Sequence, residues 1–521
     1  MVNTLPYLSF IPAHVMMSFA IIFFFLAKAV PFLKRLPASI VFFLVLIACF
    51  WLESLGSGSE AVFFEMIQVD SYSRLYNQIL FIAIAVTILM MANSDELNKD
   101  NNWEIFGLLA TVCLGMMLMT SATNLLMTVV AIELVSIPSY VLVALNRKLP
   151  ASKEASLKYV LFGSFAAGIM VYGMSLIFGL TGTLKFSGIW KGLAEYSAAG
   201  NAIYFLAVLM TLSGMVFKIA AVPFHFWCPD AYQAAPTPIT AFLSTAPKVA
   251  GLALLMRFFS YHVSLQTANL TLILSIIAMA TMTLGNLAAL KQTDIKRLLA
   301  YSSISHAGFL LMGIAVLNSA GRQAVFFYIP IYLLMNLGAF MAVIYLSRGD
   351  RFDITSYAGM IKKKPLVVIG LTVCLFSLAG LPPFAGFVGK FYLFKVVIEE
   401  GLILLAVVAA INSVISLFYY VGVIKVMVID SEDRPSKDIQ TGGFPVVFVT
   451  ACIVPIVFLG VYWVPLLNWA EKATKRSGKY LPVVHWTAGL AAWRLQDYQR
   501  ALGHFDAVAK SDYSSSWLIS A

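Results

Sequence analysis

Length, composition and charge place most of this chain in a lipid bilayer. Its 521 residues are 60% hydrophobic and only 12% charged, with a mean hydropathy of +0.87, whereas soluble domains carry roughly 25% charged residues. The formal net charge of +10 does not indicate nucleic-acid binding, because the basic residues are distributed as topology signals. The five cysteines are far apart and lack zinc or iron–sulfur spacing, so any redox chemistry is expected in another chain.

Apolar stretches of about 20 residues, the length that crosses a bilayer, predict about fourteen transmembrane helices. They are expected near residues 8–30, 38–55, 75–92, 104–121, 123–145, 156–180, 201–222, 237–259, 269–290, 298–317, 323–347, 365–397, 402–428 and 444–467. Lysines and arginines are concentrated in one alternate set of connections, whereas the other set carries four. By the positive-inside rule the richer set faces the cytoplasm, which places both termini on the outer, periplasmic side.

Two apolar stretches are too long for one span and are predicted to contain a broken helix. Residues 201–235 would reach about 52 Å as one helix, far beyond the roughly 30 Å hydrocarbon core, so we expect a break near Pro223. Residues 365–397 contain Pro382 and Pro383, which remove backbone donors. Transporters place such breaks where they line a cavity.

Ionisable residues lie at mid-membrane in and around these stretches. Glu133 and Lys248 are both central in their spans, and Lys218 and Lys390 lie beside the two breaks. A charge at the bilayer centre costs roughly 3 kcal/mol on insertion scales, so such residues are functional candidates by default. The alternative for Glu133 is a neutral carboxyl group that is hydrogen-bonded inside a packed bundle.

The spacing of these residues indicates an internal repeat. Glu133 precedes Lys218 by 85 residues, and His306 precedes Lys390 by 84. Interrupted helices in corresponding halves are the sequence signature of transporters built from repeats. His225 and His306 lie between lysines, which favours a role in proton transfer, although a lone histidine on an apolar face is more often a satisfied core residue.

These patterns divide the chain into five parts. They are N-terminal transmembrane helices (1–103), a first repeat (104–262), a second repeat (263–430), a C-terminal transmembrane helix (431–470) and an extramembrane tail (471–521). The tail contains AGLAAWRLQDYQRALGHFDAVAKSD, which is similar to part of one tetratricopeptide unit. A single unit cannot bury its own apolar face, so both docking on a partner and a frayed amphipathic tail remain open.

A family resemblance rests on the string KIAAVPFHFWCPDAYQAAPTPITAFLSTAPKVAG, on Glu133 and on PPFAGFVGKFYLF. These residues resemble the antiporter-like membrane subunits of respiratory complex I, the NADH-quinone oxidoreductase. Subunit N, the counterpart of mitochondrial subunit 2, is the most similar of them. Lys248 lies within STAPKVAG, Lys390 stands where subunit M carries a glutamate, and the chain has no room for the lateral helix of subunit L. The resemblance covers roughly residues 1–470 and does not extend to the tail.

The resemblance implies an all-α polytopic membrane protein of about fourteen helices, with two inverted five-helix repeats that each contain a broken helix. It implies proton translocation driven by quinone reduction elsewhere in a proton-pumping complex. The implied relay residues are Glu133, Lys218, Lys248 and Lys390, with His306 along the axis and His225 as a further candidate. No cofactor is expected in this chain, whereas quinone, NADH or ferredoxin, FMN and iron–sulfur clusters would belong to partner subunits.

The resulting hypothesis is a gated relay at mid-membrane. Protons would come from the cytoplasm, pass Lys218 and Lys248 through water, and leave by Lys390, while movement of Glu133 switches the proton affinity of Lys218. Expected partners are the antiporter-like subunit M, the small K- and J-type subunits and lipid, in the bacterial cytoplasmic (inner) membrane or an equivalent energy-coupling membrane. Two alternatives are a subunit of a multisubunit cation/proton antiporter and a structural spacer that moves no protons.

Overall fold

The protein is described from a computed structural model, which covers residues 11–27, 30, 36–56, 58–97, 103–146, 149–198, 202–261, 268–347, 352–430 and 443–476. The tetratricopeptide-like piece of the predicted tail lies outside these residues. Ten helices within them are long and apolar enough to cross a membrane, or eleven if a bent pair near the C-terminal end counts as one span. The chain is therefore an all-α polytopic membrane protein, as its composition predicts.

The N-terminal half of the bundle consists of helices and one short hairpin. The elements are α2 (Pro12–Ala27), α3 (Ala38–Leu55), β1 (Glu60–Val62), β2 (Ile67–Val69), α4 (Ser71–Ala92), α5 (Trp103–Ser121), α6 (Leu125–Val143), α7 (Pro150–Thr181), α8 (Phe186–Ala198), α9 (Ala202–Lys218), α10 (Trp227–Ala234) and α11 (Thr237–Ser260). The antiparallel β1–β2 hairpin, which pairs Glu60 with Val69, and the short helix α8 were not predicted from the apolar pattern, because neither spans the membrane.

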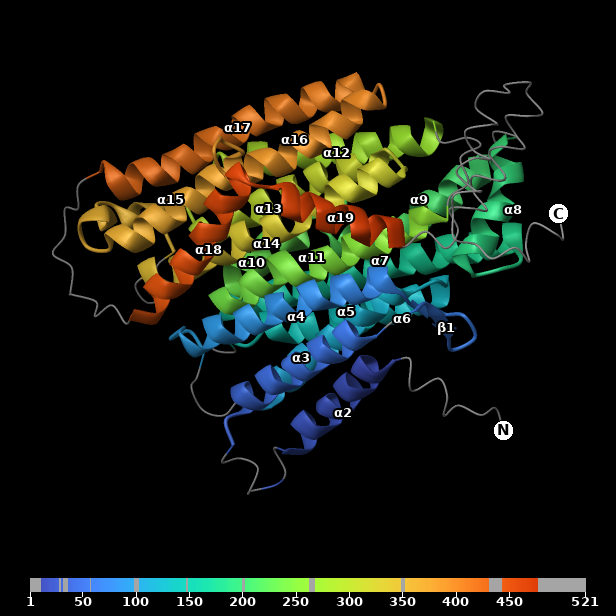
Figure 1. Ribbon diagram of the computed structural model, residues 1–521, viewed down its shortest axis with the longest axis horizontal. Coiled ribbons are helices and arrows are strands. Elements are labelled where there is room, and N and C mark those ends of the chain that lie inside the picture. The colour runs from blue at the N-terminus through green and yellow to red at the C-terminus, as the bar shows by residue number, and fades with distance from the viewer. Residues whose placement is uncertain are drawn as a thin grey trace.

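The C-terminal half continues the same arrangement. Its elements are α12 (Ala268–Ala289), α13 (Ile295–Ala315), α14 (Ser319–Leu346), the 3₁₀ turns η2 (Ile354–Tyr357) and η3 (Met360–Lys362), α15 (Pro365–Ala379), α16 (Ala385–Glu399), α17 (Ile403–Val428), α18 (Gly443–Val461) and α19 (Val464–Arg476). In Figure 1, α2 and α3 lie along one edge of the bundle and α15, α16 and α17 along the opposite edge.

The predicted last span, residues 444–467, is not one straight helix. The chain bends by 85° between α18 and α19, and α19 then packs against α14 and α4. Pro465, near the start of α19, has no N–H to donate to the carbonyl of Val461, so the helix cannot continue through this point. The apolar pattern predicted one span here and did not indicate the bend, because hydropathy alone does not encode direction.

Burial follows polarity across the bundle. In the most apolar 18-residue segment of α11 every residue is buried, and in that of α13 94% of the residues are buried. These two helices are nevertheless the least apolar of the candidate spans. In α3, the most apolar candidate span, only 28% of the residues are buried. Polar side chains in a membrane protein are placed inside the bundle because lipid cannot pair them. The polar helices α11 and α13 therefore form the centre.

Close contact between α12 and α13 fixes the position of α13. A Cβ atom built on Gly285 would come within 2.7 Å of the backbone nitrogen of Ser305, and one on Gly308 within 2.6 Å of Met282 Cγ. Small residues at such crossings let two helix backbones approach in the membrane. The helix that carries His306 is thereby held against its neighbour on both sides of the histidine.

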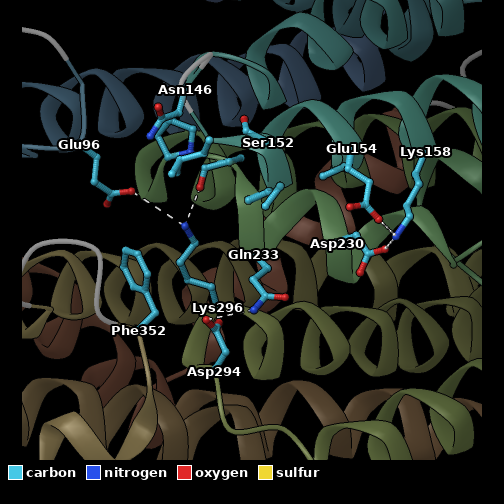
Figure 2. Close-up of a pocket in the computed structure, with 16 residues that line it drawn as sticks. Glu96, Asn146, Ser152, Glu154, Lys158, Asp230, Gln233, Asp294, Lys296 and Phe352 are labelled. Atoms are coloured by element: carbon cyan, nitrogen blue, oxygen red, sulfur yellow. Dashed lines mark hydrogen bonds and ion pairs between the residues drawn. The ribbon is translucent and has the colours of Figure 1, made fainter.

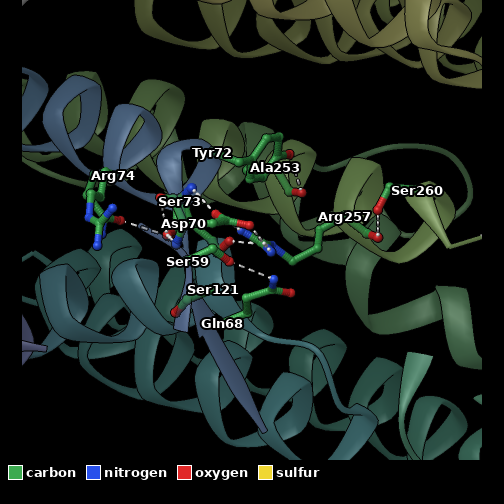
Figure 3. A network of polar contacts seen from close by, with 12 residues as sticks. Ser59, Gln68, Asp70, Tyr72, Ser73, Arg74, Ser121, Ala253, Arg257 and Ser260 are labelled. Atoms are coloured by element: carbon green, nitrogen blue, oxygen red, sulfur yellow. Dashed lines mark hydrogen bonds and ion pairs between the residues drawn. The ribbon is translucent and has the colours of Figure 1, made fainter. Parts of the chain in front are cut away.

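A buried ion pair joins α11 to the start of α4. Arg257 donates to both carboxylate oxygens of Asp70, over 3.0 and 2.8 Å, and its Nε donates to the carbonyl of Thr120 over 2.7 Å (Figure 3). Asp70 also caps α4, because its carboxylate accepts from the backbone N–H of Ser73. The side chains of Arg257 and Asp70 are only 4% and 9% exposed. This pair fixes three helix ends at the side of the bundle predicted to face outward.

Candidate functional site

The chain between α9 and α10 forms the first broken helix, around Pro223 as predicted. The backbone N–H of Val222 donates to the Thr281 hydroxyl of α12 over 3.0 Å. The indole N–H of Trp227 donates to the carbonyl of Phe217 near the end of α9 over 3.3 Å. A break at membrane depth requires such partners, because lipid offers none. Thr281 of α12 and a contact between the two halves of the helix therefore stabilise this break.

Lys218 is the last residue of α9 and is 1% exposed. Its ammonium group donates to the Ser136 hydroxyl of α6 over 3.2 Å. Glu133, half-buried and three residues earlier on the same helix, interacts with Lys218 electrostatically. The C-terminal end of a helix carries a partial negative charge that favours a cation. The first cluster thus contains a lysine, a hydroxyl group that contacts it, and a carboxylate on the same helix as that hydroxyl.

Lys248 lies inside α11 next to a proline that alters the local hydrogen bonding. Pro247 has no N–H for the carbonyl of Leu243, and the hydroxyl of Tyr232 donates to that carbonyl instead, over 2.8 Å. Lys248 itself is 2% exposed and donates to the Ser303 hydroxyl of α13 over 2.8 Å. A tyrosine from α10 and a serine from α13 therefore fix the middle of the site.

His306 lies on α13 and is 2% exposed. Its Nδ1 is 2.9 Å from the Tyr328 hydroxyl of α14, and its Nε2 is 3.5 Å from the Tyr420 hydroxyl of α17. Tyr420 is also hydrogen-bonded to Ser302, one turn earlier on α13. The positive charges of Lys390 and Lys248 both act on the imidazole. The structure thus brings His306 between the two lysines.

The second break separates α15 from α16 at the predicted prolines, Pro382 and Pro383. Lys390, on the second turn of α16, is 3% exposed. Its ammonium group donates to the carbonyl of Ala379, the last residue of α15, over 2.9 Å and to the Ser413 hydroxyl of α17 over 3.2 Å. The amine therefore meets the negative C-terminal end of a half-helix.

Lys218 and Lys390 lie on opposite sides of their helix breaks. The similar intervals of 85 and 84 residues that precede them in the sequence did not indicate this difference. Lys218 ends the first half of its broken helix, and Lys390 belongs to the second half. Each ammonium group nevertheless lies near the C-terminal end of a half-helix. Half-helix ends of this kind bind ions in transporters.

His225 lies in the first break and is 3% exposed. Its ring centroid is 4.3 Å from that of Phe226, and its Nδ1 has no hydrogen-bond partner. No hydrogen bond joins it to Lys218 or Lys248, which are both among the described residues. The structure therefore places Glu133 on the helix whose Ser136 contacts Lys218, and Lys248, His306 and Lys390 along the centre, but leaves His225 beside them.

A polar pocket of about 370 Å³ lies at the end of the bundle predicted to face the cytoplasm, between α7, α10 and α13 (Figure 2). Lys158 is held there between Glu154, at 2.7 Å, and Asp230, at 2.9 Å. Asp230 also accepts from Arg297 over 2.6 Å. Lys158 is therefore part of a charge network at this end of α7.

One short helix separates this pocket from the buried lysines. Asp230 lines the pocket from α10, while the ring centroid of Tyr232, two residues later, is 5.6 Å from the ammonium nitrogen of Lys248. Trp227, the first residue of α10, stacks on Tyr159 of α7 with ring centroids 3.9 Å apart. The pocket therefore approaches the lysines through the second half of the first broken helix.

Sequence reasoning missed the hydroxyl groups that contact the ionisable residues. They are Ser136, Ser303, Tyr328, Ser413 and Tyr420, and Ser302 contacts Tyr420. Ser136 and Ser303 carried a local signal, because each lies three residues from a candidate residue on the same helix, Glu133 and His306 respectively, and Ser302 lies four residues from His306. Among the described residues, no group of three or more His, Cys, Asp or Glu side chains could hold a metal ion.

The chain is similar to membrane subunits of known complexes. The family model described as "NADH:quinone oxidoreductase/Mrp antiporter, TM" matches residues 122–416, more than half of the sequence. NADH-quinone oxidoreductase subunit N of Anaeromyxobacter sp. (strain Fw109-5) is 39% identical over 443 residues, which cover 79% of this chain and 85% of the relative.

Two solved structures resemble the whole bundle. A chain of respiratory complex I from Thermus thermophilus with bound aureothin superposes with a TM-score of 0.74 at 30% identity, covering 88% of this chain and 98% of that one. A chain of the Mrp complex from Dietzia sp. DQ12-45-1b superposes with a TM-score of 0.75 at 21% identity, covering 89% and 97%. At that lower identity the second likeness shows the fold alone.

Proposed function

Since the chain belongs to the subunit N family of NADH-quinone oxidoreductases, we propose that the protons it translocates pass along its buried Glu/Lys/His relay. The chain is a proton-translocating membrane subunit of a complex I type enzyme. Its described residues supply the amines, imidazole and carboxylate for that transfer at membrane depth. The relay comprises Glu133, Lys218, Lys248, His306 and Lys390, with His225 as a further candidate beside the first break.

One observation carries this proposal: each relay lysine is buried and is paired with a neutral oxygen instead of a carboxylate. Lys218, Lys248 and Lys390 are 1%, 2% and 3% exposed. They donate to serine hydroxyls, and Lys390 also to a backbone carbonyl. A permanent structural charge in a low-dielectric interior needs an opposite charge beside it. An amine with only neutral partners is suited to losing and regaining a proton.

Glu133 switches the first of these amines. A carboxylate that approaches an ammonium group favours the charged form, and burial favours the neutral form. Glu133 interacts with Lys218 at a distance, and Ser136 contacts Lys218 directly. Moving one charge across 100 mV costs about 2.3 kcal/mol, and a hundredfold change in proton affinity supplies about 2.7 kcal/mol. A shift of the carboxylate towards Lys218 that changes its proton affinity a hundredfold therefore supplies enough free energy to move one proton against about 100 mV.

Protons enter the relay from the polar pocket at the predicted cytoplasmic end. Asp230 and Lys158 line its wall, and α10 leads from there to the surroundings of Lys248. Water carries the proton between side chains that do not touch. The proton leaves beyond Lys390, on the opposite half of the bundle.

The described helices fit two repeats of five crossings. Residues 104–262 contain α5, α6, α7, the broken pair α9–α10, and α11; residues 263–430 contain α12, α13, α14, the broken pair α15–α16, and α17. The fourth crossing is broken in both. Five is an odd number, so the second repeat begins on the opposite side of the membrane and the two are inverted. With the first three helices and the last bent span, the total is fourteen.

The other regions of the chain, the cofactors, the partners and the location of the complex are proposed by analogy with the family. Residues 1–103 and 431–470 flank the repeats, and 471–521 form an extramembrane tail. NADH or ferredoxin, FMN, iron–sulfur clusters and the quinone belong to partner subunits. The direct neighbours are an M-type antiporter-like subunit, small K- and J-type subunits and lipid. The complex lies in the bacterial cytoplasmic membrane, or an equivalent one, with both termini of this chain outside.

The second candidate function is a subunit of a cation/proton antiporter. The Mrp family shares the matching family model and the fold. Sodium transport by a preparation that lacks every quinone-reducing partner favours this alternative. A structural spacer is a third reading, which the three buried lysines disfavour, because leucine would pack there without a desolvation cost.

Substitution of the first cluster tests the relay. Lys218→Met and Glu133→Gln remove one charge each with little change of volume. The expected result is a complex that assembles fully but loses coupled proton translocation, measured as protons moved per NADH oxidised in proteoliposomes. Glu104→Gln, on an exposed residue of α5, is the matched control and retains coupling. Undiminished translocation in both cluster variants contradicts the relay.

A further inference from the structure

A single aromatic ring lies against both His306 and Lys390. Phe309, three residues after His306 on α13, is 1% exposed. Its ring centroid is 4.6 Å from the ammonium nitrogen of Lys390 and 6.1 Å from the centroid of the imidazole. No hydrogen bond joins His306 to Lys390, both of which are among the described residues. Phe309 is therefore the contact that the two groups share.

The hydrogen bonds of His306 and Lys390 are made with other residues and not with each other. The imidazole nitrogens of His306 meet the hydroxyls of Tyr328 and Tyr420. The ammonium group of Lys390 meets the α15 terminus and α17. A phenyl ring accepts no proton and relays none. Among the described residues, no chain of hydrogen bonds leads from His306 to Lys390, so a transfer between them needs water, and the ring of Phe309 occupies space next to both groups.

The attraction between the ring and the amine depends on the proton. A cation over the face of an aromatic ring is held by the ring's negative quadrupole, and more strongly where water is excluded. A neutral amine lacks this attraction. The ring is therefore held against Lys390 when the lysine is protonated and is released when the lysine is neutral.

On the basis of the relay proposed above, we propose that Phe309 is a positioning residue that gates the transfer from His306 to Lys390 and that the protonated lysine itself closes this gate. When Lys390 is neutral, the ring turns aside and water joins the two groups. An N–H bond of the imidazolium then breaks and an N–H bond forms at Lys390 Nζ, with no transfer of electrons. The ring returns to the new ammonium group and prevents the proton from going back.

Such a gate matters most when the membrane is energised. Without a membrane potential, little force drives the proton back from Lys390 to His306. At high potential the release of the proton from Lys390 to the outer side is opposed, so Lys390 stays protonated for longer and return to His306 competes with release. Loss of the gate is therefore expected to lower coupling only at high potential. A packing defect lowers assembly or activity at every potential.

Graded fluorination of Phe309 is the sharpest test. One, two or three ring fluorines make the face of the ring progressively less negative at nearly constant size. In the intact complex in proteoliposomes, protons moved per NADH are expected to match wild type at low potential. At high potential the ratio is expected to fall with each fluorine, by about twofold for the trifluoro ring, because the cation–π attraction is lost.

Two controls separate the gate from other effects. The same fluorinated series at Phe340, a fully buried ring of α14, is expected to leave the ratio unchanged. Phe309→Leu, which fills the space without an aromatic face, is expected to reproduce the trifluoro result. A ratio that is independent of fluorination and of Phe309→Leu at high potential overturns the gate.

Lys390→Met distinguishes failure of the gate from failure of the relay. If Lys390→Met abolishes pumping while the Phe309 variants pump normally, the relay stands and the gate is wrong. If Lys390→Met pumps normally, the relay itself is wrong and the gate falls with it. A potential-dependent loss in the Phe309 series, together with full loss in Lys390→Met, supports both.

Discussion

Lys390 donates a hydrogen bond to the carbonyl oxygen of Ala379, the residue at which α15 ends. The last carbonyls of a helix have no partner within it, so an amine from α16 stabilises the end of α15. The two halves of the broken helix are thereby joined by the side chain proposed to carry the proton. Protonation of Lys390 and the stability of this helix end are coupled.

This contact separates the structural role of Lys390 from proton transfer. Arginine stays protonated throughout the working range, so Lys390→Arg keeps a donor for Ala379 but cannot release a proton. We expect Lys390→Arg to assemble with wild-type thermal stability and to lose coupled pumping. Protons per NADH and the unfolding temperature of the complex measure the two effects.

Lys395 provides the matched control for this substitution. It lies on the same helix, is 51% exposed and pairs with Glu399 at 3.7 Å. Lys395→Arg is expected to retain both stability and pumping. Normal pumping in Lys390→Arg excludes proton release at this position.

The pocket at the predicted cytoplasmic end contains the second testable element. Asp230 binds both Lys158 and Arg297, and Asp230→Asn leaves these two cations without their shared carboxylate. Because like charges then repel an incoming proton, we expect several-fold slower coupled turnover, measured as the rate of NADH oxidation with proton uptake. Glu154→Gln removes the other, 66% exposed carboxylate on Lys158 and is expected to have little effect. Equal rates in the two variants argue against uptake through this pocket.

The Arg257–Asp70 pair contributes stability instead of proton transfer. Arg257→Met leaves the buried carboxylate of Asp70 unpaired, and breaking a buried pair in this way costs about 3–5 kcal/mol. We expect a clear fall in the unfolding temperature and in the amount of assembled complex. The double variant Arg257→Met/Asp70→Asn removes both charges, keeps a helix-capping side chain and is expected to recover part of the loss. A single variant as stable as wild type contradicts this role.

Two buried tyrosines offer a paired test of the kink at Pro247. Tyr232→Phe leaves the carbonyl of Leu243 without its donor, which costs about 1–3 kcal/mol for a buried acceptor. Tyr76 is equally buried, but among the described residues its hydroxyl makes no hydrogen bond of ordinary geometry, so Tyr76→Phe is expected to be neutral or stabilising. Thermal unfolding of the two variant complexes measures the difference, and a smaller loss in Tyr232→Phe than in Tyr76→Phe contradicts the assignment.

Sequence reasoning found the breaks and the buried ionisable residues because their signals are local. The prolines at 223, 382 and 383 disturb any helix that contains them, and a lysine such as Lys248 in the middle of an apolar run is costly wherever that run packs. At the end of the chain the apolar pattern predicted a span but did not indicate the bend between α18 and α19, although Pro465 lies there.

The sequence by itself determined which segments enter the membrane, where two of them break and which ionisable residues lie at depth, because hydropathy, length and proline act within one segment. Only the tertiary structure decided what each of those residues meets. Ser136 contacts Lys218 across 82 positions, and Arg257 contacts Asp70 across 187. An isolated helix fixes its own axis but not its rotation about that axis. Packing against neighbouring helices sets that rotation, and with it the hydroxyl, carbonyl or ring that faces each lysine.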